Sequence, residues 1–468
     1  MADIRLINLP YQEELVTLFE QFRDLPLPIL LDSNHNHFSD TRFDIIVADP
    51  LATISANAHT HTLEWKDQAL YDFSKKRSPF KTINTLLSLI CDEPWAKRAS
   101  KKYPFTGGVM GYFAYESGQY LEELPESTKR DITLPDVVAG LYGWAIISLH
   151  ESKETVLILT PWCDQTSEQD IVKRLTKDNL RTRTEFTLHD KFTSNMSAFD
   201  YSDKFNQVQH YIRAGDCYQV NLAQRFSATC HGDAFVAYQK LRKSCPTPFS
   251  AYIDVAPQQS ILSHSPERFF LCNDGQVESK PIKGTRPRGK TPQEDQQLAQ
   301  DLLNSDKDKA ENVMIVDLLR NDMGRSCLTG SIKVPKLFSL ESYANVHHLV
   351  STITGKIANN WEHFTVFQNG FPGGSITGAP KIRSMEIIDE LEPHVRSVYC
   401  GSIAYFSSNG EMDSSITIRT LVVDQENIHC WAGGGLVLDS KSEEEYQETF
   451  TKVEKLTHTL EVNFHRSK

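Results

Sequence analysis

Strand-like and helical segments follow one another without a regular order along this chain of 468 residues, and this irregularity most constrains its fold. Runs rich in β-branched and aromatic residues predict strands at 43–48, 140–149, 155–159, 252–255, 261–263, 269–272, 402–406 and 416–423, with a turn at 409–410. Apolar residues at helical spacing predict helices at about 201–213, 292–304, 309–320, 380–391 and 443–461. Because regular β-α-β alternation is missing, we expect an α+β fold with mainly antiparallel sheets.

The most polar part of the chain lies near residues 164–199, and we place a boundary there. The segment 164–167 predicts the start of an amphipathic helix, and a charged stretch follows it. Residues 1–190 then form an N-terminal β-rich region. Residues 191–468 contain all the motifs that indicate chemistry.

Composition excludes several classes of protein. A net charge of −12 argues against a general affinity for nucleic acid. No apolar run approaches the roughly 20 residues of a membrane helix, and the N-terminus lacks the pattern of a signal peptide, so we expect a cytoplasmic protein. The nine cysteines never occur as Cys-x-x-Cys, which favours neither a disulfide framework nor a zinc site.

In the sequence Pro281-Ile282-Lys283-Gly284-Thr285, the lysine follows a Pro-Ile pair with a restricted backbone and precedes a glycine with a flexible one. The basic residues Lys280, Arg286 and Arg288 lie close by in sequence. Neighbouring positive charge disfavours a second cation, so Lys283 is a candidate neutral amine, and a neutral lysine is a nucleophile. The alternative is a basic turn on the surface.

Glu311 is the most distinctive carboxylate in the sequence. On a helix it shares a stripe with Met314, Ile315 and Leu318. A buried carboxylate needs a cation, a metal or a proton, so Glu311 is either a metal ligand or half of a structural ion pair.

The last predicted helix has a second acidic stripe, formed by Glu445, Glu448 and Lys452 beside its apolar face. Ser442 and Glu445 have the spacing of a capping box, which would make Glu445 structural. Glu448 and Lys452 have the spacing of a helical ion pair, and this pair is the alternative to a binding role.

Further candidates are an arginine, three glycines, a glycine-rich segment and a histidine. Arg419 is predicted to project from one face of a strand, either into solvent or toward a carboxylate. Gly433, Gly434 and Gly435 predict a flexible turn or bulge, or a nest of amides for an anion. The segment 374–381 lacks a phosphate-loop ending and predicts a helix entry, and His348 lies in a β-branched run typical of a buried histidine.

Several of these residues belong to longer motifs that occur in a fixed order. The motifs are SPERF (265–269), PIKGT (281–285), AEN (310–312), DLLRND (317–322), VHHLVS (346–351), FPGGSITGAPK (371–381), ITIRT (416–420) and EYQETF (445–450). Together they resemble the chorismate-utilising enzymes, which include anthranilate, isochorismate, salicylate and aminodeoxychorismate synthases. The resemblance covers most of the chain and implies two large sheets packed as a sandwich with helices outside.

The resemblance also implies roles for individual residues. Lys283, Glu267, His348 and Thr285 would be catalytic. Glu311, Glu448 and Glu445 would hold Mg²⁺. The substrate would contact Arg419, Gly433, Gly434, Gly435, Lys452, Ser375 and Thr377.

Lys283 decides the branch of the family, because anthranilate synthases typically have alanine at this position. The resemblance therefore implies amination of chorismate at C4 through a Lys283 adduct at C2, with ammonia from a glutamine amidotransferase subunit. An anthranilate synthase large subunit is the alternative enzyme. A noncatalytic subunit that binds tryptophan or chorismate is the alternative from another class.

A tryptophan pocket is the last implication of the resemblance. The residues that match it are Ser33, Arg42, Phe43, Pro248, Phe249 and Ser250. Asp32 replaces a residue that is often glutamate in feedback-regulated relatives, so occupancy and regulation stay open.

Overall fold

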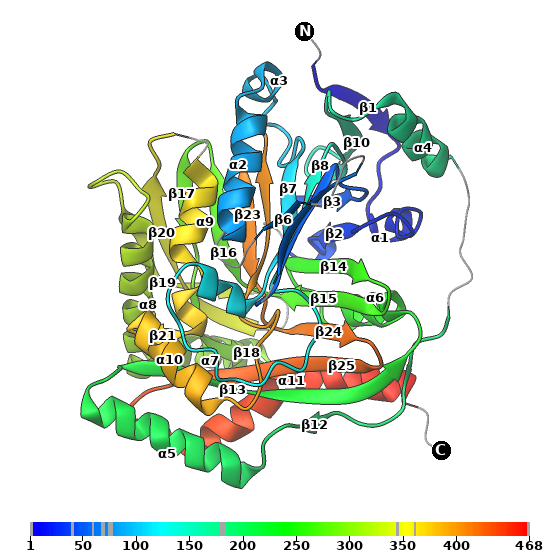
Figure 1. Cartoon of the computed structure of the whole chain (residues 1–468). Helices are drawn as coiled ribbons and strands as arrows, with labels where there is room; N and C mark the ends of the chain where they lie inside the picture. The colour runs from blue at the N-terminus through cyan, green and yellow to red at the C-terminus, as the bar shows by residue number, and fades with distance from the viewer. Residues whose placement is uncertain are drawn as a thin grey trace.

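The computed structural model describes residues 3–38, 42–58, 60–66, 71–73, 78–176, 184–342, 346–359 and 362–465. Its strands form two large sheets, which fan through the middle of the molecule in Figure 1. All the strand pairs within them are antiparallel, as between β13 (Gln219–His231) and β25 (Asn427–Leu436). The predicted α+β fold with two large antiparallel sheets is therefore confirmed.

The first sheet has 13 strands. Its order is β1 (Arg5–Leu9), β10 (Glu154–Leu159), β9 (Trp144–Leu149), β3 (Phe43–Val47), β2 (Ile29–Asp32), β14 (Phe249–Ala256), β15 (Gln259–Ser265), β24 (Thr420–Asp424), β25, β13 and β11 (Thr187–Leu188). Two short strands, β12 (Thr193–Ser194) and β21 (Gly378–Ala379), pair with β13.

The second sheet has 12 strands. Its order is β18 (Ile282–Pro287), β20 (Val346–Lys356), β17 (Gln276–Ser279), β16 (Arg268–Asn273), β23 (Met412–Ile416), β22 (Ser402–Ser407), β7 (Gly108–Phe113), β8 (Val137–Tyr142), β4 (Ala52–Ala56), β5 (His61–Trp65) and β6 (Tyr71–Phe73). In addition, β19 (Lys333–Ser342) pairs with β20.

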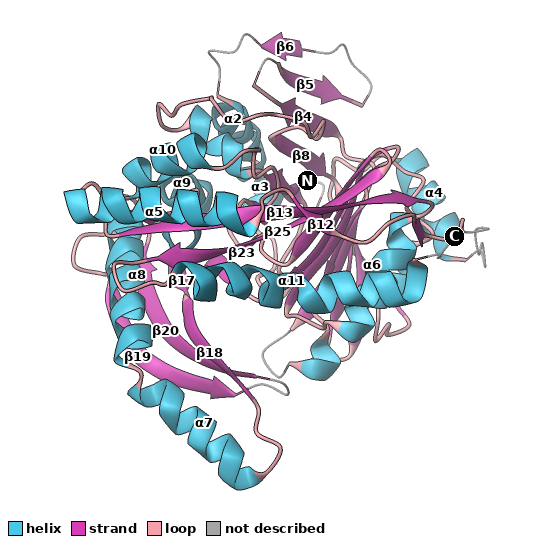
Figure 2. Cartoon of the chain, turned by 90° about the horizontal axis from the view of Figure 1, so that it is seen from below, coloured by secondary structure: helices cyan, strands magenta, loops and turns pink. Residues whose placement is uncertain are grey.

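The helices lie around these sheets, as Figure 2 shows from below. They are α1 (Val16–Phe19), α2 (Pro79–Cys91), α3 (Pro94–Lys97), α4 (Gln165–Leu175), α5 (Ala198–Ala214), α6 (Ala234–Ser244), α7 (Pro292–Asn304), α8 (Asp306–Gly324), α9 (His363–Gly370), α10 (Lys381–Leu391) and α11 (Ser442–Phe464). The short 3₁₀ helices include η1 (His35–His37), η2 (Tyr115–Tyr120) and η4 (Gly374–Ile376). The five helices predicted from apolar spacing are confirmed as α5, α7, α8, α10 and α11, and the helix predicted to begin at 164–167 is confirmed as α4.

Strand β3 shows how the chain builds two cores. Ile45 and Val47 point into a cluster that contains residues of both sheets. The alternate residue, Ile46, points to the other face, where α6 and α11 cover the first sheet. A strand that is buried on both faces has an almost continuous apolar sequence, and this is what made β3 recognisable.

Both sheets contain strands from either side of residue 190. For example, β2 pairs with β14 in the first sheet, and β7 pairs with β22 in the second. Residue 190 is therefore not a boundary between the two sheets. The division stays a prediction about which part of the chain carries the catalytic residues.

Two of the predicted strands were wrong in the same way. The run 140–149 is two strands, β8 and β9, and the run 416–423 is also two, β23 and β24. In each case the chain leaves the second sheet and enters the first. Both halves of each run are buried, so the apolar pattern continues through the crossing and hides it.

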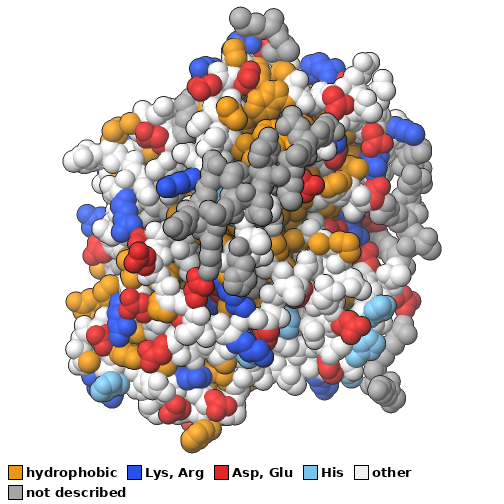
Figure 3. All heavy atoms as spheres, viewed as in Figure 1, with side chains coloured by type: hydrophobic (Ala, Val, Ile, Leu, Met, Phe, Trp, Pro, Cys, Tyr) orange, Lys and Arg blue, Asp and Glu red, His pale blue; other side chains and the backbone are white. Residues whose placement is uncertain are grey.

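No helix in the described part of the chain is long and apolar enough to cross a membrane. On the face shown in Figure 3, basic and acidic side chains are intermixed and do not gather by sign.

Candidate active site

The candidate site is built where the chain crosses between the sheets. Glu267 lies in the crossing from β15 to β16, and residues 417–419 form the crossing from β23 back to β24. The two crossings are joined by a hydrogen bond from the Ile416 amide to the Glu267 carbonyl (3.0 Å) and by another from the His264 amide to the Arg419 carbonyl (3.1 Å). These backbone bonds hold Glu267 at the junction of both sheets.

Lys283 lies on β18, at an irregularity in its pairing with β20. The register shifts between Ile282 and Thr285, and Gly284 between them has φ +81°, which favours glycine. The Lys283 amine donates to the Ser375 carbonyl over 3.2 Å. Burial lowers the pKa of this lysine, against the raising effect of Glu267 and Glu311.

The predicted cause of that shift was wrong, although a lowered pKa was expected. The sequence neighbours Lys280, Arg286 and Arg288 form ion pairs with acidic partners of their own: Glu278 (3.6 Å), Asp308 (3.0 Å) and Asp295 (2.6 Å). Alternate residues of a strand point to opposite faces, so proximity in sequence does not put these charges beside the amine. Desolvation is the main cause instead, with Lys452 as an additional positive charge.

Glu267 is the buried acid of the site, with 7% of its surface exposed. It accepts a hydrogen bond from the Ser375 hydroxyl (3.2 Å), so Ser375 contacts both Glu267 and Lys283. Burial raises the pKa of Glu267, and the charge of Lys283 and the Ser375 bond oppose this shift. The arrangement suits a carboxyl group that gives up and takes back a proton.

Thr285 and His348 lie opposite each other on β18 and β20. The Thr285 hydroxyl and His348 Nδ1 are 2.8 Å apart. Burial, followed by the charge of Arg419, lowers the pKa of His348 to about 4, so its ring is neutral at pH 7. His347 points elsewhere and bonds Asp295 and Ser342, as expected for the less favoured histidine.

The acidic residues predicted to hold a metal come from two helices. Glu311 lies on α8, whereas Glu445 and Glu448 lie on α11, together with Lys452. Burial raises the pKa of Glu311 and of Glu445. For Glu448, the charge and hydrogen bond of Lys452 outweigh burial and lower the pKa.

Lys452 connects this acidic group to the first sheet. Its amine lies 2.6 Å from Glu448 Oε1 and donates to the Gly433 carbonyl over 2.8 Å. The helical ion pair that the sequence offered as an alternative is therefore present. About half of the Glu448 side chain and 42% of the Lys452 side chain are exposed, so both can exchange partners.

The predicted capping box was wrong. Ser442 is the first residue inside α11, and the residue before it, Lys441, makes no side-chain cap. Glu445 instead accepts a hydrogen bond from the Ser440 hydroxyl over 2.7 Å and is buried. The loop before the helix turns back toward Glu445, which local spacing does not reveal.

The turn or bulge predicted at the three glycines was wrong, whereas the contact of their amides with a carboxylate stays a prediction. The glycines continue strand β25 in regular pairing with β13: Gly433 faces Ala223, Gly434 faces Leu222 and Gly435 faces Asn221. Because glycine has no side chain, Gly434 leaves room beside the carboxylates of α11. A Cβ at Gly434 would lie 2.8 Å from Glu445 Oε2 and 3.6 Å from Glu448 Oε1.

This space and the donors around it fit Mg²⁺. Mg²⁺ prefers carboxylate oxygens and keeps several waters, so it needs only one or two protein ligands and room for its hydration shell. Glu445 and Glu448 supply oxygens beside Gly434, and Glu311 lies within electrostatic range of Glu445. The ligand atoms of the three glutamates do not all lie within 4.8 Å of one another, as expected if waters complete the shell.

Arg419 does not lie on a strand face as predicted. It belongs to the crossing between β23 and β24, its φ is +50°, and it is exposed. A non-glycine residue in this left-handed region is strained, and such residues cluster at functional sites. The crossing, rather than a strand face, positions its guanidinium near His348.

Thr377 and Ser375 both lie at the turn before α10, but their hydroxyls have different hydrogen-bond partners: Ser375 donates to Glu267. The Thr377 side chain is fully buried and donates to the Gly373 carbonyl (3.1 Å), so it holds the turn together. The helix entry predicted here is confirmed, since α10 begins at Lys381 directly after Pro380.

Sequence reasoning missed a buried ion pair that supports the site. Arg396 and Glu392 are 1% and 4% exposed and lie 2.6 Å apart. Arg396 also donates to the carbonyls of Ile376 (3.0 Å) and Asn221 (2.7 Å), which joins the Ser375 turn to the strand beside the glycines. Glu392 and Arg396 have the i, i+4 spacing of a helical ion pair, which was a usable signal, whereas the carbonyl partners of Arg396 are distant in sequence.

Two further basic residues were missed. The charge of Lys307, an exposed residue of α8, acts on all three glutamates and opposes the effect of burial on their pKa values. Lys381 donates to Asp322 and to the Gly370 carbonyl, each over 2.8 Å, and thereby ties α10 to α8. Asp322 and Lys381 both lie in motifs noted in the sequence, which was a usable signal.

The residues predicted for tryptophan gather at the adjoining ends of three neighbouring strands. Ser33 follows β2, Arg42 and Phe43 mark the start of β3, and Ser250 opposes Asp32 on β14. Pro248 and Phe249 lie at the beginning of β14. Their binding of tryptophan stays a prediction.

The sequence and the fold were both compared with those of known proteins. Residues 28–458 match the model of the chorismate binding enzyme family. Aminodeoxychorismate synthase component 1 of Salmonella typhimurium is 44% identical over 97% of this chain and 98% of its own, and that of Escherichia coli is 45% identical over 95% of each. The crystal structure of anthranilate synthase component I from Streptococcus pneumoniae superposes with a TM-score of 0.76 at 28% identity, covering 89% of this chain and 92% of that one.

Proposed function

The chain belongs to the chorismate binding enzymes, and from this premise we propose that it is an aminodeoxychorismate synthase, a transferase that converts chorismate and ammonia to 4-amino-4-deoxychorismate for 4-aminobenzoate and folate synthesis. One observation carries the choice of reaction. A partly buried lysine with a lowered pKa lies beside a buried carboxyl group with a raised pKa, and one serine contacts both.

The first step uses Lys283 as nucleophile. Its neutral amine forms a C–N bond at C2 of chorismate, the ring double bonds shift, and the C4–O bond breaks. Glu267 gives its proton to the departing hydroxyl, which leaves as water. Burial favours both starting states, because it disfavours the lysine cation and the glutamate anion alike.

The second step reverses the shift. Ammonia forms a bond at C4, the double bonds return to their first arrangement, and the C2–N bond breaks to release Lys283 as a neutral amine. Glu267, now ionised, takes up the extra proton of the new ammonium group. Two displacements of this kind place nitrogen at C4 and leave the enolpyruvyl group intact.

Other residues hold the substrate. We assign the enolpyruvyl carboxylate to Arg419, because a guanidinium binds carboxylates in pairs of hydrogen bonds. The ring carboxylate lies near Lys452 and the amides of Gly433, Gly434 and Gly435, where the amine exchanges its bond to Glu448 for one to substrate. His348 and Thr285 contact the C4 end, with the His348 ring as a neutral hydrogen-bonding partner.

Glu311, Glu445 and Glu448 would hold Mg²⁺. When bound, this ion neutralises carboxylate charge and fixes the orientation of the substrate.

Ammonia would come from a partner. The relatives are named component 1, which implies a second component, and we propose a glutamine amidotransferase subunit in that role. Free ammonia replaces it in a test with this chain alone. We further propose that the enzyme acts in the cytoplasm and that the residues at the ends of β2, β3 and β14 bind tryptophan.

The test is to incubate the purified chain with chorismate, Mg²⁺ and an ammonium salt at alkaline pH, and to separate the products by chromatography with mass detection. We expect aminodeoxychorismate without pyruvate. Anthranilate with pyruvate would contradict the proposal and indicate amination at C2. No turnover with ample ammonia would favour a noncatalytic subunit.

A further inference from the structure

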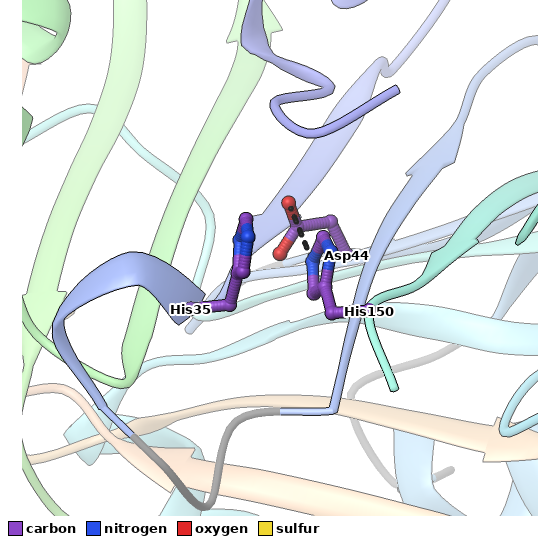
Figure 4. Close-up of side chains that lie close together, drawn as sticks. All are labelled: His35, Asp44 and His150. Atoms are coloured by element: carbon purple, nitrogen blue, oxygen red, sulfur yellow. Dashed lines mark ion pairs between the residues drawn. The ribbon is translucent and has the colours of Figure 1, made fainter. Parts of the chain in front are cut away.

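A second cluster of chemically active side chains lies in the first sheet and belongs to no part of the reaction above. It consists of His35 on η1, Asp44 on β3 and His150 directly after β9, shown in Figure 4. Among the described residues, this is the group in which three possible ligand atoms lie within 4.8 Å of one another. We propose that it binds a divalent transition metal of the zinc class.

His150 has an imidazole nitrogen without a hydrogen-bond partner. Its side chain is 5% exposed, and Nε2 is buried and makes no hydrogen bond, although it lies at ion-pair distance, 3.3 Å, from Asp44 Oδ2 (Figure 4). The two atoms are therefore close together without a hydrogen bond between them, as two ligands of one ion would be. Two ligands that bind one tetrahedral zinc through bonds of about 2.0–2.1 Å lie about 3.3 Å apart.

The remaining atoms of these two side chains are held as those of metal ligands usually are. The other nitrogen of His150, Nδ1, lies 3.0 Å from the hydroxyl of Tyr11. The other oxygen of Asp44 accepts hydrogen bonds from the amide and the hydroxyl of Ser33, each 2.7 Å. Outer contacts of this kind fix the tautomer of a ligating histidine and the orientation of a ligating carboxylate.

His35 supplies the third ligand. Its ring stacks on that of His150, with centroids 3.7 Å apart and planes 10° apart. Two parallel rings cannot both direct their in-plane lone pairs to one ion, so one ring must turn when the metal enters. His35 is the one that turns, because it is the more exposed of the two at 16%, and the Glu13 carboxylate near its Nε2 (4.0 Å) offers a further oxygen.

The donor set selects the metal. Imidazole nitrogens suit zinc and similar transition ions, whereas Mg²⁺ prefers oxygen ligands. The site therefore differs in selectivity from the glutamates on α8 and α11. Metal binding would join η1 to β3 and to the end of β9, beside the Arg42 carbonyl that accepts a hydrogen bond from the His150 amide (2.9 Å).

The test uses Co²⁺ as a spectroscopic probe on the full-length chain, after chelation and in the presence of excess Mg²⁺ to occupy the glutamates. We expect one Co²⁺ per chain with visible d–d bands of a four- or five-coordinate ion. His35→Ala and His150→Ala should each weaken binding by at least about tenfold. His37→Ala, an exposed histidine on the same η1, is the matched control and should bind as the wild type does.

Thermal denaturation gives a second readout. Zn²⁺ should raise the Tm of the wild type and of His37→Ala, but not that of His35→Ala, since only a metal bound to the folded state stabilises it. The proposal is overturned if the wild type takes up no Co²⁺ at micromolar concentration, or if both ligand variants bind like the wild type. Strong thiolate charge-transfer bands would also overturn it, because the metal would then be held by cysteines.

Discussion

Two partly buried lysines of this molecule have similarly shifted pKa values and differ in their contacts. Burial lowers the pKa of both Lys283 and Lys381. Lys381 bonds the Asp322 carboxylate and a carbonyl, each over 2.8 Å. Lys283 has a 3.2 Å bond to a carbonyl, and no carboxylate oxygen of the described residues lies within 4.0 Å of its amine.

The difference separates a structural lysine from a reactive one. A direct carboxylate holds the proton on Lys381 and fixes its position. Around Lys283 the carboxylates of Glu267, Glu311 and Glu448 act only through space, so the amine can lose its proton and move. A lowered pKa alone would not have distinguished the two residues.

The largest expected effect comes from removing the reactive amine. Lys283→Ala should lower kcat by on the order of 10³-fold or more, because the covalent step is lost while folding is not. Mass spectrometry of the enzyme with chorismate should show an adduct in the wild type and none in the variant. Lys280→Ala, a partly exposed neighbour paired with Glu278, is the control and should retain both activity and adduct.

Removing the structural amine should instead cost stability. Lys381→Met leaves the buried Asp322 carboxylate unpaired and should lower the free energy of unfolding by about 3–5 kcal/mol. Chemical denaturation measures this. The double variant Lys381→Met/Asp322→Asn should recover much of the loss, and equal stability of the single variant and the wild type would contradict the contrast between the two lysines.

The pH dependence of the reactive lysine is the third test. Because burial lowers the pKa of Lys283 from the usual 10.5, the rate at which a small amine-reactive reagent labels Lys283 should rise with pH and reach its midpoint below 10.5. The measurement is mass spectrometry of the labelled Lys283 peptide as a function of pH, because adduct formation with chorismate also needs a protonated Glu267 and would not report on the lysine alone. A midpoint at or above 10.5 would mean that the amine is no easier to deprotonate than an exposed lysine.

The smallest expected effect concerns the space beside the glutamates. Gly434→Ala places a Cβ 2.8 Å from Glu445 Oε2 and should weaken Mg²⁺ binding about tenfold, or about 1.4 kcal/mol. Titration of activity with Mg²⁺ measures this. Gly324→Ala is the matched control, since its Cβ would meet only Ile332 Cδ1 at 3.8 Å, and an equal effect of both variants would exclude a role for the space at Gly434.

Local patterns in the sequence predicted much of this site because several of its residues lie on regular elements. The stripe of Glu311 and Ile315 on α8 and the acidic stripe of α11 follow from helical periodicity. The strand around Lys283 and its irregular pairing at Gly284 were not predicted, because the alternative considered there was a basic turn.

Contacts between distant segments could not be predicted in this way. Arg396 reaches Ile376 and Asn221, and Ser440 reaches Glu445 across the start of a helix. Arg419 was misplaced because the apolar run 416–423 hides a change of sheet. In each case the deciding interaction depends on how strands from different parts of the chain pair, which local spacing does not encode.

The crossings at Glu267 and Arg419 also bear on how the protein is made. Glu267 acquires its place only when its carbonyl meets the Ile416 amide, and Arg419 only when its carbonyl meets the amide of His264. About 150 residues must therefore be synthesised after Glu267 before either crossing closes, and such distant pairing makes folding slow. A nascent or truncated chain would consequently be catalytically silent, so activity would appear only after both sheets have assembled.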